Sequence, residues 1–281
     1  MGFIRYFFMP LLGIFITFSL PAKAPKTKIK ALCWDLCYTL CKPSPTVLLQ
    51  VAGTIDFGMY TTWDGKGTDQ LRSCINDVLS LSGTQKMSSG SLICDCYGDA
   101  YAQLTVDLFS GKITAQQALD EVLQYTQELN NLKYFYNERE YRLCTNTLNF
   151  MFDAKNFAES IQPYEKSSAI LEKYSRYTHY ILTNWNEESF VELRKNKAMN
   201  DIFTYCDREH CFISGQIGYL APQPEFYQAF LKKYNLKPEE CLVIDDQEEN
   251  IIAAQKCGMH AHYFKNNNFE LLEKKLQEVL S

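Results

Sequence analysis

The sequence predicts an α/β fold, a doubly wound parallel sheet that carries an inserted, mainly helical cap domain. From about residue 160 onward, short apolar runs alternate with helical patterns, which is typical of a parallel sheet covered by helices on both faces. One earlier apolar run, "IKALCWD", is separated from that region by a long, mostly helical stretch. The expected core is therefore residues 29–45 and 161–281, and residues 46–160 are the expected helical insertion.

The elements of the first half follow from local patterns. "ALCWD" indicates a buried strand, and the prolines of "CKPSP" indicate a loop after it. The stretch "GTIDFGMYTTWDGKGTD" holds several glycines and predicts a loop that can hold short elements. The clearest helix is "TAQQALDEVLQYTQEL", where Thr114 can cap the first turn and an apolar stripe follows at helical spacing. "GDAYAQLTVDLF" shows a similar pattern.

In the second half, strands and helices are expected to alternate. The expected strands are "THYILTN", "HCFISG", "ECLVIDD" and "HAHYF". The expected helices are "SSAILEKYSR", "EESFVELRK", "PEFYQAFLKKY", "EENIIAAQKCG" and "NNFELLEKKLQEVL", the last capped by Asn268.

Charge and the first residues bear on partners and location. The net charge of −5 is spread along the chain, so no nucleic-acid partner is expected. Residues 1–24 have an early Arg5, a short apolar stretch and small residues at Ala22 and Ala24, the layout of a secretory signal peptide. Pro25 disfavours cleavage there, which makes a retained membrane anchor the alternative. The prediction is a periplasmic, secreted or membrane-anchored protein that contacts the membrane only through this segment, and a cytoplasmic location stays open.

The eleven cysteines count against an exported location. Their number is odd, and so many thiols are unfavourable in an oxidising compartment. Several fall on expected buried strands, where cysteine behaves as a small apolar residue. No histidine lies near the run that holds Cys33, Cys37 and Cys41, or near Cys94 and Cys96, so no zinc site is expected.

Polar side chains end three of the expected strands. Asp35 ends the first, Thr183 and Asn184 end another, and Asp245 and Asp246 end a third. In open parallel sheets, ligands bind beyond the carboxyl ends of the strands. Each residue alone has an ordinary explanation, because strand-end aspartates are commonly helix caps or turn residues. Their joint occurrence indicates one polar cleft.

The chemistry of that cleft follows from its charge. Crowded carboxylates repel one another unless a cation lies between them, and their oxygens suit Mg²⁺ together with a substrate phosphate. The pattern therefore predicts a Mg²⁺ site at Asp35, Asp245 and Asp246 and a small phosphorylated substrate. Asp35 is the expected nucleophile, forming an aspartyl-phosphate. Thr183 and Asn184 are the expected substrate-binding residues, with Thr183 donating a hydrogen bond to the transferred group.

Four runs together resemble the haloacid dehalogenase (HAD) superfamily of hydrolases. They are "WDLCYTL", "ILTN", "GYLAPQPEFY" and "LVIDDQEENIIAAQKCG", and the resemblance covers most of residues 29–265. It implies a doubly wound, Rossmann-like core. Members with a long insertion after the first motif carry a helical cap, which matches the place of residues 46–160.

The resemblance also implies roles for single residues. The nucleophile falls on Asp35, the phosphate-binding threonine on Thr183, and the metal-binding acids on Asp245 and Asp246. The metal is further expected to take the backbone carbonyl of Cys37.

Two positions depart from the pattern of family phosphatases. Where Cys37 stands, those enzymes have a second aspartate that protonates the leaving group, and a thiol with an unperturbed pKa of about 8.5 replaces it poorly. Where Ala221 stands, they have a lysine that pairs with the nucleophile and the phosphate. Lys195 and Lys197 are the candidate replacements for that charge.

Three functions are compatible with these residues. The first is a weakened Mg²⁺-dependent phosphohydrolase, for which an acyl phosphate would be the least affected substrate. The second is a non-catalytic binding protein on the same scaffold, favoured by the two lost groups. The third is a dehalogenase-type hydrolase, favoured by the missing second aspartate and by Tyr38 beside Cys37. Ala221 and the intact acid pair count against the third. The Mg²⁺-dependent phosphohydrolase is favoured slightly over the binding protein.

Overall fold

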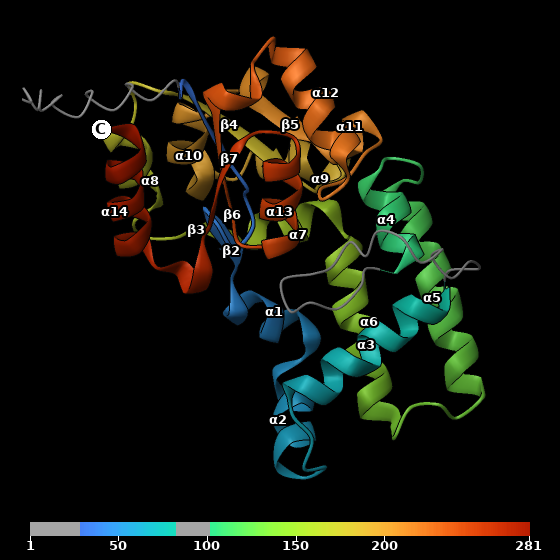
Figure 1. Ribbon diagram of the computed structural model, residues 1–281. Helices are drawn as coiled ribbons and strands as arrows, with labels where there is room; N and C mark the ends of the chain where they lie inside the picture. Colours follow the sequence, from blue (N-terminus) through green and yellow to red (C-terminus); the bar gives the residue numbers. More distant parts are fainter. Residues whose placement is uncertain (1–28, 83–101) are drawn as a thin grey trace, which may run out of the picture.

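The computed structural model describes residues 29–82 and 102–281 (Figure 1). The segment expected to be a signal peptide or anchor, residues 1–24, and the pair Cys94 and Cys96 lie outside the described residues, so those interpretations stay predictions. Within the described ranges, no helix is both long and apolar enough to cross a membrane.

The core is a five-stranded sheet with strand order β5-β4-β1-β6-β7, in which all neighbouring strands run parallel. Trp34 of the central strand pairs in register with Ile181 on one side and Ile244 on the other. The carboxyl ends of β1, β4 and β6 therefore lie next to one another. The strands are β1 (Ala31–Trp34), β4 (Thr178–Thr183), β5 (Cys211–Ile213), β6 (Cys241–Asp245) and β7 (His260–Tyr263).

Helices cover both faces of this sheet, which confirms the predicted doubly wound α/β fold (Figure 1). Leu32 and Trp34 point into one apolar cluster with α8, α9, α10 and α14, whereas Ala31 and Cys33 point into the other with α12 and α13. This alternation is the two-residue period of a strand. The helices are α8 (Ser167–Lys173), α9 (Glu187–Leu193), α10 (Asn200–Tyr205), α11 (Ser214–Ile217), α12 (Pro224–Tyr234), α13 (Glu248–Lys256) and α14 (Phe269–Leu280).

The cap is inserted between two short strands, β2 (Cys41–Pro43) and β3 (Ile161–Pro163), which pair antiparallel. Its first six helices enclose an apolar cluster separate from those of the sheet, so the cap has a core of its own. Figure 1 shows this helical group on one side of the sheet, joined to it through β2 and β3. The helices are α1 (Pro45–Ala52), α2 (Thr54–Thr62), α3 (Thr68–Ser82), α4 (Gln103–Phe109), α5 (Ala115–Asn131), α6 (Glu138–Phe152) and α7 (Ala154–Ser160).

Two local predictions are wrong. "CKPSP" is not a loop: it holds β2 and the start of α1, because Pro45 is the first residue of that helix, where proline loses no hydrogen bond. "GTIDFGMYTTWDGKGTD" holds α2, whose Tyr60 is fully buried in the core of the cap. That packing outweighs the low helix propensity of Gly58.

Two predicted helix caps are confirmed. The Thr114 side chain accepts a hydrogen bond from the Gln117 backbone nitrogen at 3.1 Å, and Gln117 returns one to the Thr114 backbone. The Asn268 side chain accepts a hydrogen bond from the Leu271 backbone nitrogen at 3.0 Å. Both helices therefore begin where the sequence places their caps.

A polar seam joins the cap to the core. The buried Ser214 hydroxyl, in α11, donates a hydrogen bond to the Phe109 carbonyl of the cap at 2.7 Å. The Ala115 backbone nitrogen donates to a Glu188 carboxylate oxygen in α9 at 3.0 Å. Gly111 lies against Gly215, where an added Cβ on Gly111 would come within 2.3 Å of the Gly215 carbonyl oxygen. The seam thus leaves no room for a side chain at that position.

We expect Gly111→Ala to destabilise the protein more than Gly65→Ala. Both glycines have left-handed φ, +71° and +65°, but nothing lies within 4 Å of a Cβ added at Gly65. Both variants lose about 1–2 kcal/mol from the left-handed backbone. Only Gly111→Ala also overpacks the seam, which adds a further ~1–3 kcal/mol. Urea denaturation measures both, and equal losses would show that the seam is not tightly packed.

Candidate functional site

Three acids meet at the carboxyl ends of β1 and β6. Asp35 follows β1, and its backbone nitrogen donates to the Ile244 carbonyl at 2.9 Å. Asp245 ends β6 and Asp246 follows it. One oxygen from each of the three carboxylates lies within 4.8 Å of the others. Among residues 29–82 and 102–281, no lysine or arginine forms an ion pair with any of them.

Neighbouring polar groups hold two of these acids in place. Asp245 is buried and accepts hydrogen bonds from the Gln247 backbone nitrogen at 2.8 Å and from the Asn250 side-chain amide at 3.0 and 3.2 Å. Asp245 thus fixes the turn that leads into α13 through its contact with Gln247. The buried Thr39 hydroxyl lies 3.3 Å from an oxygen of Asp246 and donates to it.

Burial raises the pKa of all three acids, and repulsion between carboxylates adds to the rise at Asp35 and Asp245. Burial, followed by the charges of Asp245 and Asp246, raises the pKa of Asp35 well above its ordinary value, although a hydrogen bond from Thr183 opposes this. Burial and the charge of Asp246 raise the pKa of Asp245 to about 8. Burial raises the pKa of Asp246 to about 6, against hydrogen bonds with Thr39 and Asp35. A bound cation would therefore favour the ionised form of all three carboxylates near neutral pH.

The donor set fits a divalent cation that binds oxygen. Three carboxylates supply hard oxygen ligands, and Mg²⁺ keeps several waters in addition to one or two such groups. The Oδ1 atom of Asn250 is buried beside Asp245 and has no hydrogen-bond partner among the described residues. An orphaned buried acceptor costs about 1–3 kcal/mol. A water molecule in the shell of a bound ion would satisfy it.

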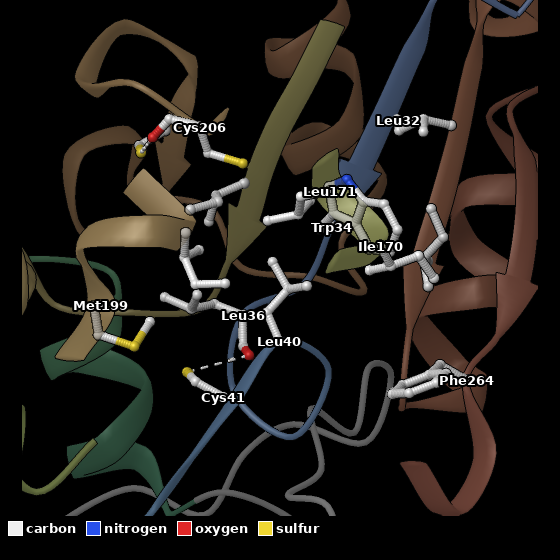
Figure 2. Close-up of a cluster of buried hydrophobic side chains, with 14 of the residues drawn as sticks. Leu32, Trp34, Leu36, Leu40, Cys41, Ile170, Leu171, Met199, Cys206 and Phe264 are labelled. Atoms are coloured by element: carbon white, nitrogen blue, oxygen red, sulfur yellow. Dashed lines mark hydrogen bonds between the residues drawn. The ribbon is translucent and has the colours of Figure 1, made fainter. Parts of the chain in front are cut away.

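The loop after Asp35 is folded tightly onto the core. The backbone nitrogens of Leu40 and Cys41 both donate to the Leu36 carbonyl, at 2.9 and 3.0 Å, and Tyr38 has a left-handed φ of 63°. Leu36, Leu40 and Cys41 pack into the apolar cluster, and the Cys41 thiol donates to the Leu36 carbonyl at 3.4 Å (Figure 2). Cys37 is half-buried in this loop. That its carbonyl binds a metal stays a prediction.

Thr183 and Asn184 lie at the end of β4, beside β1. Thr183 is buried, and its side chain donates the hydrogen bond that favours ionised Asp35. The side chain of Asn184 donates to the Ala221 carbonyl at 2.8 Å and accepts from the Ala221 backbone nitrogen at 2.9 Å. Asn184 thus fixes the loop that holds the cis peptide bond between Ala221 and Pro222. A contact between Asn184 and substrate stays a prediction.

The two lysines considered as replacements for the charge missing at Ala221 make contacts elsewhere. The Lys195 ammonium lies 2.6 Å from a carboxylate oxygen of Glu192 and is exposed. Lys197 is also exposed and begins the short helix η1 (Lys197–Met199), which packs against β3. Neither forms an ion pair with the acid cluster in the described part of the chain.

Two residues that hold the site were not assigned a role from the sequence. Thr39 follows Asp35 by four residues, and Asn250 lies in the first turn of α13. The spacing from Asp245 to Asn250 offered a signal, because a residue in the first turn of a helix lies close to the residues that lead into that helix. Thr39 contacts Asp246 only because the loop folds back, which local sequence patterns do not reveal.

Comparison with known proteins places these residues in a family context. A family model described as haloacid dehalogenase-like hydrolase matches residues 29–258. The chain is 35% identical over 80 residues to the sesquiterpene phosphatase astK of Aspergillus oryzae, covering 28% of this chain and 38% of that protein. It is 27% identical over 117 residues to the glyceraldehyde 3-phosphate phosphatase of Pyrococcus furiosus, covering 41% and 47%. The chain thus matches less than half the length of each relative.

Solved structures share the fold. A HAD family enzyme from Bacteroides thetaiotaomicron, in a magnesium complex, superposes with a TM-score of 0.50 at 17% identity, covering 88% of this chain and 99% of that one. A structure described as a dehalogenase superposes with a TM-score of 0.52 at 14% identity, covering 90% and 98%. At this identity the likeness shows the architecture of sheet and cap and leaves the reaction open.

The raised pKa values predict how stability depends on pH without metal. The unfolded chain has aspartate pKa values of about 4, so the folded chain binds these protons more tightly, and stability falls as pH rises between about 4 and 8. In EDTA, we expect Asp245→Asn to raise the melting temperature at about pH 8 and to change it little at about pH 3, where Asp245 is largely protonated in both states.

The matched control for this experiment is Asp201→Asn, which changes an exposed aspartate in α10 outside the acid cluster. The melting temperatures of this variant at the two pH values should differ by the same amount as those of the parent protein. A melting temperature of Asp245→Asn below that of the parent at the higher pH would contradict the crowding of charges at the site.

Proposed function

Since the chain belongs to the haloacid dehalogenase-like hydrolase family, we propose that it is a Mg²⁺-dependent phosphohydrolase acting on a small phosphorylated molecule. The observation that carries the proposal is the convergence of Asp35, Asp245 and Asp246 within 4.8 Å, without an ion-pairing lysine or arginine among the described residues. The phosphatases among its relatives support the substrate class.

Asp35 is the nucleophile in this proposal. One of its carboxylate oxygens attacks phosphorus, the bond from phosphorus to the leaving oxygen breaks, and an aspartyl-phosphate forms. Water then attacks the same phosphorus, which releases inorganic phosphate and restores the carboxylate. The Thr183 hydroxyl lies against Asp35 and donates a hydrogen bond to an oxygen of the transferred group.

Asp35, Asp245, Asp246 and the backbone carbonyl of Cys37 would hold Mg²⁺, which would neutralise the carboxylates and part of the charge of the phosphate. Asn250 and Thr39 orient Asp245 and Asp246 through the hydrogen bonds described above. Because both hydrogen bonds come from the chain itself, they hold the two acids in place while a metal ion binds or leaves.

Two positions weaken the proposed reaction. Cys37 occupies the place of a proton donor, and Ala221, which is buried, leaves the loop held by Asn184 without a positive charge. A general acid contributes typically ~10²–10⁴-fold to the rate. We therefore propose slow turnover, with a preference for leaving groups that depart without a proton, such as the carboxylate released from an acyl phosphate.

The second candidate function is phosphate or metal binding without turnover. Cys37 and Ala221 favour it, because both replace groups that take part in the chemistry of family phosphatases. It shares the Mg²⁺ site with the first proposal and differs only in the absence of product. A dehalogenase reaction is less well supported, since the three acids form a site suited to a cation.

The replacement Asp35→Asn tests for turnover. We expect the parent protein to release phosphate from a panel of phosphate esters and acyl phosphates with Mg²⁺ and to stop in EDTA. Asp35→Asn should lower kcat by at least about 10³-fold, because an amide is a poor nucleophile. Asp201→Asn, the exposed control, should retain the parent rate. No release from any substrate, together with Mg²⁺-dependent thermal stabilisation, would favour the binding protein.

Restoring a proton donor tests the weakness ascribed to Cys37. We expect Cys37→Asp to raise the rate on an alkyl phosphate by about 10²-fold or more and to change the rate on nitrophenyl phosphate much less, because only the alkoxide needs a proton to leave. Cys37→Asn has the same shape as Cys37→Asp without the acid and should give no such gain. Equal effects of the two variants would contradict the role ascribed to this position.

A further inference from the structure

A second concave region lies along the free edge of the sheet. This edge hollow, of about 250 Å³, is bounded by α9, by the edge strand β5 and by α12. It shares no residue with the acid cluster. Its side chains fall into two groups, a basic rim and an apolar floor.

The rim of the edge hollow carries three cations, Arg194, Arg208 and Lys233. Among residues 29–82 and 102–281, none of the three forms an ion pair with a carboxylate. The chain as a whole carries a net charge of −5, so these three cations form a locally positive region on a negatively charged protein. It provides a field that attracts an anion into the hollow.

Aromatic rings hold two of these cations in position. The Arg194 guanidinium carbon lies 4.8 Å from the ring centre of Phe203, and the Lys233 ammonium lies 5.4 Å from that of Phe212 and 5.1 Å from that of Tyr234. Cation–π contacts of this kind restrict long side chains before a ligand arrives. Less conformational entropy is then lost on binding.

Arg194 also contacts the Cys211 side chain in the lining of the hollow. An Arg194 nitrogen lies 3.6 Å from the Cys211 sulfur. Burial raises the pKa of the Cys211 thiol to about 11, and the positive charges of Arg194 and Lys233 both oppose that rise. Both charges therefore act at the Cys211 end of the hollow.

The acids near the hollow are engaged by other groups. Glu187 lies in the lining and accepts a hydrogen bond from the Gln216 side chain at 3.0 Å. Asp207 precedes β5 and accepts hydrogen bonds from the backbone nitrogens of Glu209 and His210 at 2.9 and 3.0 Å. Neither carboxylate forms an ion pair with a cation of the rim among the described residues.

The floor of the hollow is apolar. Phe190 and Ile213 are buried there, and Val191 is 47% exposed beside them. A ligand that used both parts of the surface would place an anionic group at the rim and an apolar body on the floor.

We propose that the edge hollow binds a small organic dianion, a phosphate or phosphonate group that carries an apolar body, at a site separate from the acid cluster. The anionic group takes charge-assisted hydrogen bonds from Arg194, Arg208 and Lys233, and the apolar body covers Val191 and the buried floor. This inference does not depend on turnover at Asp35.

Calorimetric titration of the full chain with phenylphosphonate in EDTA tests this site, because removal of metal ions leaves the acid cluster repulsive to a dianion. We expect saturable binding of one molecule per chain. Arg194→Gln and Lys233→Gln should each weaken it about tenfold, the effect of losing one charge-assisted hydrogen bond. Inorganic phosphate should bind more weakly than phenylphosphonate, because it leaves the floor uncovered.

Lys232→Gln is the matched control, since Lys232 is the exposed neighbour of Lys233 in α12 and does not line the hollow. It should bind phenylphosphonate as the parent does, and all variants should keep the parent melting temperature. Arg208→Gln, at an exposed position, replaces any variant that fails to fold. The proposal is overturned by a lack of saturable binding at millimolar phenylphosphonate, or by equal weakening in Lys232→Gln and Lys233→Gln.

Discussion

The repulsion between three carboxylates at the ends of adjacent strands is the constraint on which the rest of the site depends. Asp35, Asp245 and Asp246 come within 4.8 Å of one another because β1 and β6 are hydrogen-bonded neighbours in a parallel register. Burial raises the pKa of each acid, and repulsion between carboxylates adds to the rise at Asp35 and Asp245. Such an arrangement is unfavourable unless protons or a cation neutralise it. This repulsion is the physical basis of our proposal that the site binds a metal ion and a phosphate.

The surrounding structure holds this unfavourable group together. The start of α13 fixes Asp245, and the tight loop after β1 brings Thr39 to Asp246. Asn184 fixes the loop of Ala221 beside the same strand ends. The cap is joined to the core by its own hydrogen-bonded seam at Ser214, on the side of α9 and α11. The chain thus has the scaffold of a haloacid dehalogenase-like hydrolase, and Cys37 and Ala221 are the two positions at which our proposal expects a weakened reaction.

Much of this arrangement could be predicted from the sequence, for physical reasons that differ between elements. Local signals predict several features from the sequence alone. They are the apolar runs with a period of two, the acids at the strand ends, and the helix caps at Thr114 and Asn268. Helix α2 could not be predicted in this way, because its formation depends on the packing of Tyr60 against the rest of the cap. The contact between Thr39 and Asp246 joins distant segments of the chain, and the edge hollow is lined by several separate segments. Neither feature produces a periodic pattern in the sequence.

The most direct test of the central claim is a calorimetric titration of the full chain with Mg²⁺ near neutral pH, in two buffers that differ in their enthalpy of ionisation. If the three acids form a metal site whose pKa values are raised by crowding, one ion binds per chain and displaces protons, so the measured heat differs between the buffers. The absence of Mg²⁺ binding, or binding with the same heat in both buffers, would contradict the account.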